Sequence, residues 1–195
     1  FAPVYEEINR RKAVAYTHPI SASCCQNILP GIGDGAIEWG TDTTRAITRM
    51  VFGGAAARYP DLRVIFSHAG GTMPFLIERF INMAKGSQYA AQLPQGFLAA
   101  AKKFYYDTAH ASKVPALDAL KDIAPVSQIL YGSDVPLRGY ELTDEGLDAY
   151  PGFSPADWDA INRGNAEKLF PRLKGLAVAR AARPGELRRP FFFRV

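Results

Sequence analysis

The sequence predicts an α/β fold with a parallel sheet, built as half of a TIM-type (β/α)8 barrel. Short apolar segments alternate with longer helical patterns four times, which is typical of parallel strands joined by helical crossovers. Each apolar segment is followed by a polar side chain, as the strands of such barrels are at their active-site end. The chain has 195 residues, whereas a complete barrel needs about 250. Four units in this length amount to half a barrel.

The four expected strands are short and end in polar residues. They cover 13–16, 62–66, 104–106 and 128–131. The polar residues that follow them are His18, His68, Asp107 and Asp134. Parallel strands end at the same edge of a sheet, so we expect these four side chains to line one face of an active site. An open doubly wound sheet is the alternative, but it would concentrate its ligand site at one switch point.

Helical patterns fill the stretches between the strands. A short helix over 3–12 precedes the first strand. A loop rich in Pro, Gly and Ser follows that strand over 20–35, and a long helix then covers 37–58 until Pro60 stops it.

Capping residues mark the later helices. We expect Thr72 to cap a helix that runs to Lys85, with Pro74 in its first turn. Ser154 is the expected cap of a helix near the end of the chain, because Pro and an acidic residue follow it. The remaining helices are expected over 97–102, 112–123, 154–163 and 165–170.

The net charge of +4 is unevenly distributed. Residues 174–195 carry six basic side chains and one acidic side chain, a net +5, which leaves −1 for the rest of the chain. We therefore expect a barrel domain over 1–173 and a basic, irregular tail over 174–195. A basic tail can bind acidic surfaces. Because no aromatic stacking motif or zinc-finger spacing accompanies it, we expect a solvated end and no nucleic-acid partner.

Targeting and redox features indicate a cytoplasmic protein. No apolar run reaches membrane-spanning length and no secretory signal pattern is present, so we expect no membrane partner. Cys24 and Cys25 are adjacent, where a bridge would be strained, and they suit a reducing compartment. We expect them to be small buried fillers, with soft metal ligands as the alternative. Because the chain begins with Phe1 rather than Met, we expect a processed piece or a fragment of something longer.

His18, His68 and Asp134 form the candidate site. Neutral imidazole and carboxylate are ligands of zinc and related divalent ions. No short motif joins the three residues, so their convergence is expected from strand-end placement alone. Asp107 either lines the same pocket or caps the helix that follows it. Trp39 could also line a pocket, although core packing is the default for a tryptophan.

Five segments carry a family resemblance. They are Thr17–Pro19, Phe66–Pro74, Tyr106–Ala109, Leu130–Pro136 and Gly164–Phe170. In this order and spacing they resemble the amidohydrolase superfamily. The closest likeness is to the branch that holds the aminocarboxymuconate-semialdehyde, γ-resorcylate and 6-methylsalicylate decarboxylases. The resemblance covers about 1–171 and implies the C-terminal half of the barrel, strands five to eight.

The resemblance implies roles for four residues. His18 would be the metal ligand after strand five, and Asp134 the ligand after strand eight, also touching the metal-bound water. His68, after strand six, would be the catalytic acid/base. Arg79 would reach into a neighbouring subunit's site and bind the substrate carboxylate. The metal would be zinc, with manganese as the alternative, and the protein would be a homo-oligomer, a dimer.

One departure from the family pattern leaves three functions open. The family's strand one carries a His-x-His or Glu-x-His pair of further ligands; this chain has no such pair, and its third histidine, His110, lies elsewhere. We expect a shortened metal-dependent, non-oxidative decarboxylase of a small aromatic or muconate-like carboxylic acid. A metal-dependent hydrolase of a lactone, ester or amide, with Asp134 as base, is the second hypothesis. A non-catalytic barrel fragment is the third.

Overall fold

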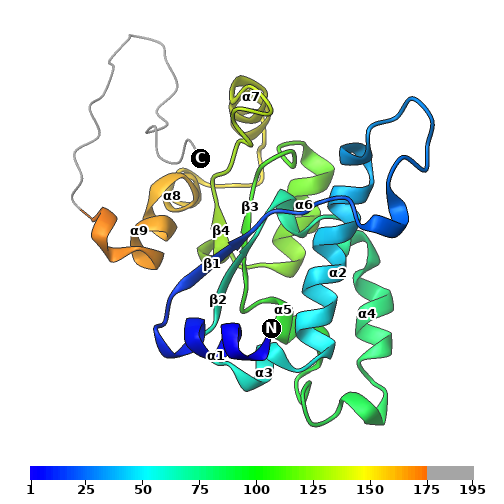
Figure 1. Cartoon of the computed structure of the whole chain (residues 1–195). Helices are drawn as coiled ribbons and strands as arrows, with labels where there is room; N and C mark the ends of the chain where they lie inside the picture. Colours follow the sequence, from blue (N-terminus) through cyan, green and yellow to red (C-terminus); the bar gives the residue numbers. More distant parts are fainter. Residues whose placement is uncertain (175–195) are drawn as a thin grey trace.

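The computed structural model describes residues 1–174, and their central feature is a parallel sheet (Figure 1). Its strands are β1 (Val14–Thr17), β2 (Arg63–Phe66), β3 (Tyr105–Asp107) and β4 (Ile129–Leu130). They lie side by side in chain order, and each neighbouring pair is parallel. This is the α/β arrangement that the sequence predicts. The predicted tail lies outside the described residues apart from Lys174.

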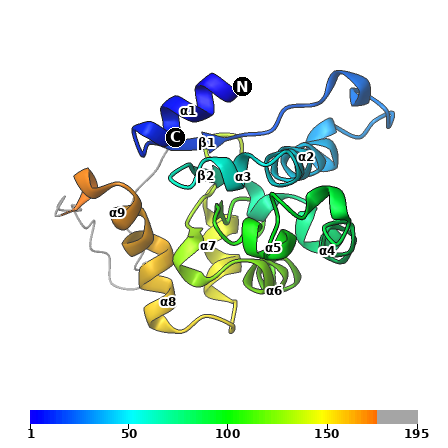
Figure 2. The same cartoon turned by 90° about the horizontal axis from the view of Figure 1, so that it is seen from below.

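Helices lie on both sides of the sheet. Figures 1 and 2 show α2, α4, α5 and α6 on one side, with α8 and α9 on the other. The first group covers Glu38–Phe52, Ile77–Met83, Gly96–Ala101 and Val114–Ile123, in that order. The main hydrophobic core lies between this group and the sheet. It includes Phe66 from β2, Tyr106 from β3 and Ile129 from β4, all fully buried.

The opposite face of the sheet carries a smaller apolar cluster. Ile65 of β2 and Leu130 of β4 point to this face, where they pack with Leu169 of α9 (Asn165–Leu169). Successive side chains of a strand alternate between the two faces. Both faces are therefore apolar, as is typical of a parallel sheet.

The first helices are shorter than the sequence predicts. Helix α1 covers Ala2–Arg10. The long helix predicted over 37–58 is divided into α2 and α3 (Ala55–Arg58). Gly54 lies at the break with φ of +76°, a left-handed conformation that glycine adopts easily and that interrupts an α-helix.

The region of Thr72 also differs from its prediction. The Thr72 side chain makes no capping hydrogen bond, and its hydroxyl lies 3.0 Å from that of Thr44 on α2. A short 3-10 turn, Met73–Leu76, therefore precedes α4. The prediction of a cap at Thr72 is wrong because α2 offers its hydroxyl a closer partner.

The C-terminal helices combine a confirmed cap with two unpredicted features. Ser154 caps α8 (Pro155–Asp159), and its hydroxyl accepts a hydrogen bond from the Asp157 N–H at 3.2 Å. A π-helical turn, Ala160–Gly164, then joins α8 to α9. Helix α7 (Glu141–Asp148) was not predicted. Within residues 1–174, every helix is too short or too polar to cross a membrane.

Candidate metal centre

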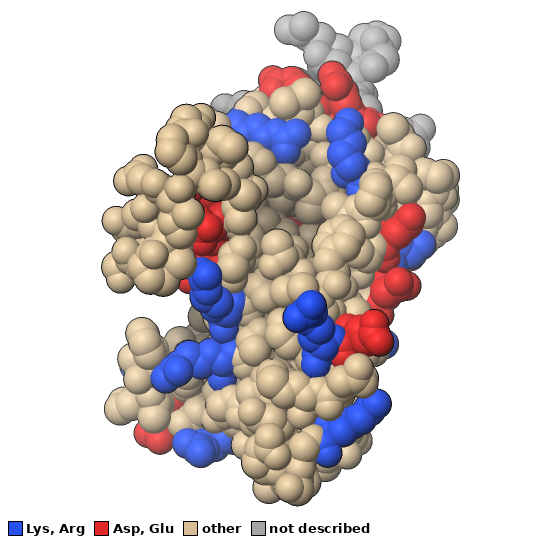
Figure 3. All heavy atoms as spheres, turned by 90° about the vertical axis from the view of Figure 1, so that its right-hand side faces the viewer, with Lys and Arg blue, Asp and Glu red and all other residues tan. Residues whose placement is uncertain are grey.

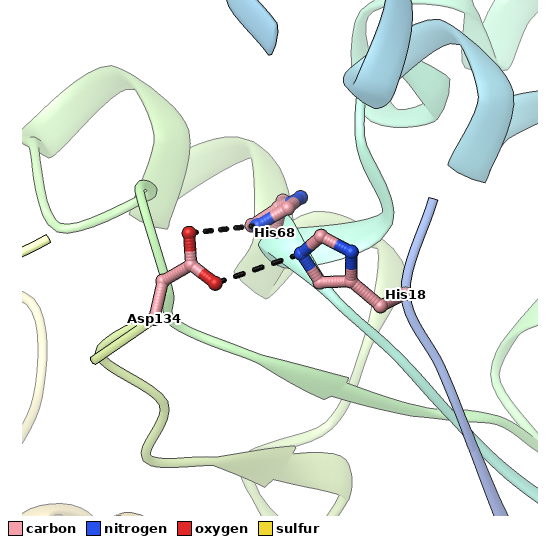
Figure 4. Close-up of side chains that lie close together, drawn as sticks. All are labelled: His18, His68 and Asp134. Atoms are coloured by element: carbon pink, nitrogen blue, oxygen red, sulfur yellow. Dashed lines mark ion pairs between the residues drawn. The ribbon is translucent and has the colours of Figure 1, made fainter. Parts of the chain in front are cut away.

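Three strands deliver potential metal ligands to one edge of the sheet. His18 follows β1, His68 follows β2, and Asp134 lies in the loop after β4. The two imidazole rings and the carboxylate point toward one another (Figure 4). Nε2 of His18 lies 3.5 Å from Oδ1 of Asp134, and Nε2 of His68 lies 3.8 Å from Oδ2. One donor atom from each residue lies within 4.8 Å of the other two, so one cation could contact all three.

The backbone around His68 adopts an uncommon conformation. His68 and Ala69 have φ of +57° and +53°, in the left-handed region that residues other than glycine seldom occupy. Gly71 has φ of +67°, and a Cβ there would collide with the carbonyl oxygen of Gly40 on α2. The Gly-Gly pair after His68 therefore lets this loop pack directly against α2, and the packed loop fixes the position of His68.

Asp107 holds this loop through its side chain. Its Oδ1 accepts hydrogen bonds from the backbone N–H of His68 at 2.9 Å and of Ala109 at 3.0 Å. Its Oδ2 accepts one from the hydroxyl of Tyr16 on β1. The carboxyl group is buried, and burial raises the pKa of Asp107 to about 6 although these hydrogen bonds oppose the shift. The sequence left two roles open for Asp107, lining the pocket or capping the following helix. In the structure Asp107 lines the pocket and does not cap α6.

The ring of His68 is suited to a cation. Its Nε2 is buried and has no hydrogen-bond partner among the described residues. Burial lowers the pKa of His68 to about 4, so the ring is neutral at pH 7 and one nitrogen offers a lone pair. A buried polar atom without a partner costs free energy. His18 and Asp134 supply an imidazole and a carboxylate for a divalent cation, and a hydroxyl group bound beside that ion would give Nε2 of His68 a partner, so the residues present fit such an ion.

A third histidine, His110, belongs to this cluster, so the expectation that it lies elsewhere is wrong. Nε2 of His110 lies 2.9 Å from Oδ2 of Asp134. Its ring is edge-on to that of His68, with centroids 5.4 Å apart. The available signal was its place shortly after β3, since loops at this end of the strands reach the same edge of the sheet. The contact with His110 holds Oδ2 of Asp134, and Oδ1 of the same carboxylate faces His18. A contact of this kind, made by a residue outside the ligand set, orients a metal ligand.

A cavity of about 580 Å³ opens beside the cluster. It is lined by residues from all four strands, from the loop after β4 and from α9. His68 and Asp134 form part of its polar wall, and Ile65 and Leu130 contribute apolar surface. A mostly apolar cavity with a few convergent polar groups is typical of a small-molecule site.

Trp39, the two cysteines and Arg79 all lie outside the hydrophobic core. Trp39 is half-buried and packs edge-on against His18, with ring centroids 5.6 Å apart, so its default placement in the core is wrong. Cys24 is exposed and Cys25 half-buried, so the expectation of buried fillers is wrong too; their turn after β1 faces solvent. Arg79 is exposed on α4 and does not line the cavity.

Comparison with known proteins places the chain in a family. The amidohydrolase family model matches residues 1–172. This chain belongs to the amidohydrolase family. The chain is 34% identical over 184 residues to decarboxylase macB of Penicillium terrestre, covering 89% of this chain and 54% of that protein. It is 32% identical over 190 residues to the 6-methylsalicylic acid decarboxylase of Penicillium expansum, covering 90% and 55%. The chain thus spans about half the length of these relatives.

The fold of this chain is also found in solved structures. A dihydroxybenzoic acid decarboxylase from Polaromonas sp. JS666, with bound manganese and the inhibitor 2-nitroresorcinol, matches with a TM-score of 0.70 and 22% identity. The match covers 88% of this chain and 53% of that protein. At this identity the likeness establishes the shared fold alone.

Proposed function

We propose that this chain carries the metal-binding edge of a non-oxidative decarboxylase that acts on a small aromatic carboxylic acid. The convergence of His18, His68 and Asp134 around the unpartnered Nε2 of His68 is the observation that carries the proposal. The names of the two curated relatives, both decarboxylases, support the reaction type.

We assign β1 to β4 to strands five to eight of a (β/α)8 barrel, its C-terminal half. The order His18, His68, Asp134 along consecutive strand ends supports the assignment. The coverage of about half of each relative supports half of a barrel, without indicating which half. On this assignment the face of Ile65 and Leu130 is the interior of the barrel.

His18 and Asp134 would hold the metal, zinc by family resemblance or manganese by analogy with the bound structure. When bound, the ion supplies a Lewis acid that attracts the substrate's carboxylate or a neighbouring hydroxyl and stabilises developing negative charge. His110 would keep the Asp134 carboxylate oriented through the 2.9 Å contact at Oδ2. Asp107 would keep His68 in place by accepting its backbone N–H.

His68 would move the proton. Its pKa is lowered to about 4, so the imidazole is neutral at pH 7, and a proton that it takes from a hydroxyl of the substrate is held weakly and is readily passed on. As the bond to the carboxylate breaks, carbon dioxide leaves and the electron pair remains on the ring carbon. The imidazolium of His68 then donates its proton to that carbon, which completes the exchange of carboxylate for hydrogen.

Arg79 would bind the substrate carboxylate in the site of a second subunit. Its exposure on α4, away from the cavity of its own chain, is compatible with such a role. Phe75, just before α4, has 71% of its surface exposed. Figure 3 shows wide uncharged areas between scattered charged side chains on the side of the molecule that carries α4. The exposed apolar residues Phe75, Ile81 and Met83, just before and on α4, support a homodimer contact there.

The experiment is a carbon dioxide release assay on the zinc- or manganese-loaded chain with a panel of hydroxybenzoates, run beside a hydrolysis assay with lactones. We expect carbon dioxide from a hydroxybenzoate, its loss in His68→Asn, and no hydrolysis. Mixing the inactive variants Arg79→Gln and His68→Asn should restore part of the activity, because a mixed dimer contains one intact site. Hydrolysis in place of carbon dioxide release would contradict the proposal. A metal-loaded chain that performs neither reaction would favour the non-catalytic fragment.

A further inference from the structure

Two adjacent thiols lie outside the candidate metal centre. Cys24 and Cys25 belong to a 3-10 turn, Ser23–Cys25, which the Cys25 N–H closes by donating to the Ala22 carbonyl at 2.8 Å. Both cysteines are free, and Cys24 is exposed to solvent. Nothing in the proposed decarboxylation uses them.

The turn brings the two sulfur atoms together. In an extended chain, neighbouring side chains point to opposite sides. Here the Sγ atoms of Cys24 and Cys25 lie on the same side of the turn, in hydrogen-bonding contact. The Nη2 atom of Arg45, on α2, lies 3.8 Å from the Cys25 sulfur. The result is a preassembled pair of thiols with a cation beside one of them.

We propose that Cys24 and Cys25 form a thiol–disulfide exchange site that reacts with small soluble disulfides of the glutathione class and closes to a reversible vicinal disulfide. In the first step the Cys24 thiolate attacks one sulfur of the small disulfide. That sulfur–sulfur bond breaks, a mixed disulfide forms on Cys24, and the first small thiol leaves with a proton. Cys25 then loses its proton to water and attacks the Cys24 sulfur. This releases the second small thiol, so two electrons pass from the cysteine pair to the small disulfide.

The contacts of the two sulfurs favour this order. Cys24 is the exposed member, so it is the sulfur that a small disulfide reaches first. The hydrogen bond with Cys24 is the first cause of the raised pKa of the Cys25 thiol; Arg45 opposes the shift, and Glu38, which lies 3.9 Å from Arg45, adds to it. Once Cys24 is in the mixed disulfide, that hydrogen bond is lost and the charge of Arg45 remains. The second thiolate then forms beside Arg45, whose effect on the thiol exceeds that of its partner Glu38, and this favours its attack.

The disulfide formed between Cys24 and Cys25 would be easily reduced. Consecutive Cα atoms are about 3.8 Å apart, closer than the roughly 4.4–6.8 Å usual for disulfides. Such a bridge is strained, and strained, exposed disulfides are the more oxidising and labile ones. We therefore expect a mild thiol to reduce it.

The exchange site lies close to the candidate metal centre along the chain and in space. Ser21, at the base of the same segment, accepts a hydrogen bond from Nε1 of Trp39 through its hydroxyl at 3.3 Å. Its carbonyl accepts one from the Gln26 side chain, also at 3.3 Å. Trp39 in turn packs against His18. Ser21, in the segment that carries the thiol pair, is therefore two contacts away from His18.

The test incubates the fully reduced chain with oxidised glutathione and follows its intact mass. The chain contains two cysteines, so the readout is unambiguous. We expect the monomer to lose two hydrogen atoms without a retained glutathione, and dithiothreitol to restore the original mass. In the matched variant Cys25→Ser, reaction should stop at one glutathione adduct, and far-UV circular dichroism checks that this variant is folded. A wild-type chain that stays unmodified, retains glutathione, or forms disulfide-linked dimers would overturn the proposal.

Discussion

The backbone N–H of His68 donates a hydrogen bond to Oδ1 of Asp107 at 2.9 Å. The bond joins the end of β3 to the loop after β2, and it supports a residue whose φ of +57° is rarely adopted by histidine. The same oxygen accepts the N–H of Ala109 at 3.0 Å. A buried carboxyl group thus fixes the position of the imidazole from behind, while the opposite side of the ring faces the cavity.

Replacement of Asp107 by alanine should destabilise the chain. The change leaves the N–H groups of His68 and Ala109 without their acceptor, and each buried group left unpaired costs about 1–3 kcal/mol. We expect a loss of about 2–5 kcal/mol in the free energy of unfolding, measured by urea titration. Asp159→Ala, at an exposed position on α8, is the matched control and should change stability little. Equal stability of both variants would show that the Asp107 bonds do not hold the loop.

The ring of His68 should remain neutral well below pH 6.5. Its pKa is lowered to about 4 because burial disfavours the imidazolium. The chain has three histidines, so their ring signals can be followed by NMR in the metal-free protein, with His68→Gln to assign one of them. We expect the His68 signal to stay unchanged between pH 8 and pH 5. A midpoint near 6.5 would contradict the buried, unpartnered geometry.

The same shift has a consequence for stability. The unfolded chain binds a proton on this histidine near the ordinary pKa of about 6.5, whereas the folded chain binds it only near 4. The contribution of neutral His68 to the free energy of unfolding is therefore fully present above pH 6.5. It is lost as pH falls from 6.5 toward 4. The difference in the free energy of unfolding between wild type and His68→Gln should therefore become smaller as pH falls from 6.5 to 4.

Removal of the His110 imidazole should weaken metal binding without abolishing it. The contact to Oδ2 of Asp134 at 2.9 Å orients the carboxylate, and loss of such an outer contact typically lowers metal affinity about 10- to 100-fold. We expect His110→Phe, which keeps a ring beside His68, to show this loss by isothermal titration with Zn²⁺. His110→Asn retains a polar group and should recover part of the affinity. Unchanged affinity in His110→Phe would mean that Asp134 is held by other contacts.

The cap of α8 offers a test of the fold that is independent of the metal. Ser154 and Asp157 form a reciprocal pair, in which each side chain accepts the backbone N–H of the other. Ser154→Ala removes one half of this pair and should cost about 1 kcal/mol in urea titration. The exposed Ser127→Ala serves as the control. If the two substitutions have the same effect, the cap contributes nothing measurable.

The sequence predicted the strands because their signal is local. Short apolar runs between helical patterns identified β1 to β4 to within about two residues, and the Ser154 cap was readable from its own neighbours. The break at Gly54 was missed because apolar spacing continues across it. Thr72 was assigned as a cap because sequence shows its own helix but not the partner on α2.

The cluster was predictable only in part. His18 and His68 stand just after strands and Asp134 lies in the loop after β4, where parallel topology brings side chains to one edge. His110 contacts Asp134 through a loop with φ of +54° at the histidine, and no local pattern indicates that turn. The two cysteines were expected to be buried, but they lie in a 3-10 turn that faces solvent. In this turn their side chains do not point apart, as they would in an extended chain.

Metal binding by the purified chain tests the central claim most directly. Isothermal titration with Zn²⁺ and with Mn²⁺, together with elemental analysis after dialysis, gives the number of ions bound per chain. The convergence of His18, His68 and Asp134 predicts one ion per chain at neutral pH, and it predicts that Asp134→Asn and His18→Ala each abolish that binding. No binding above trace, or binding that both variants retain, would contradict it.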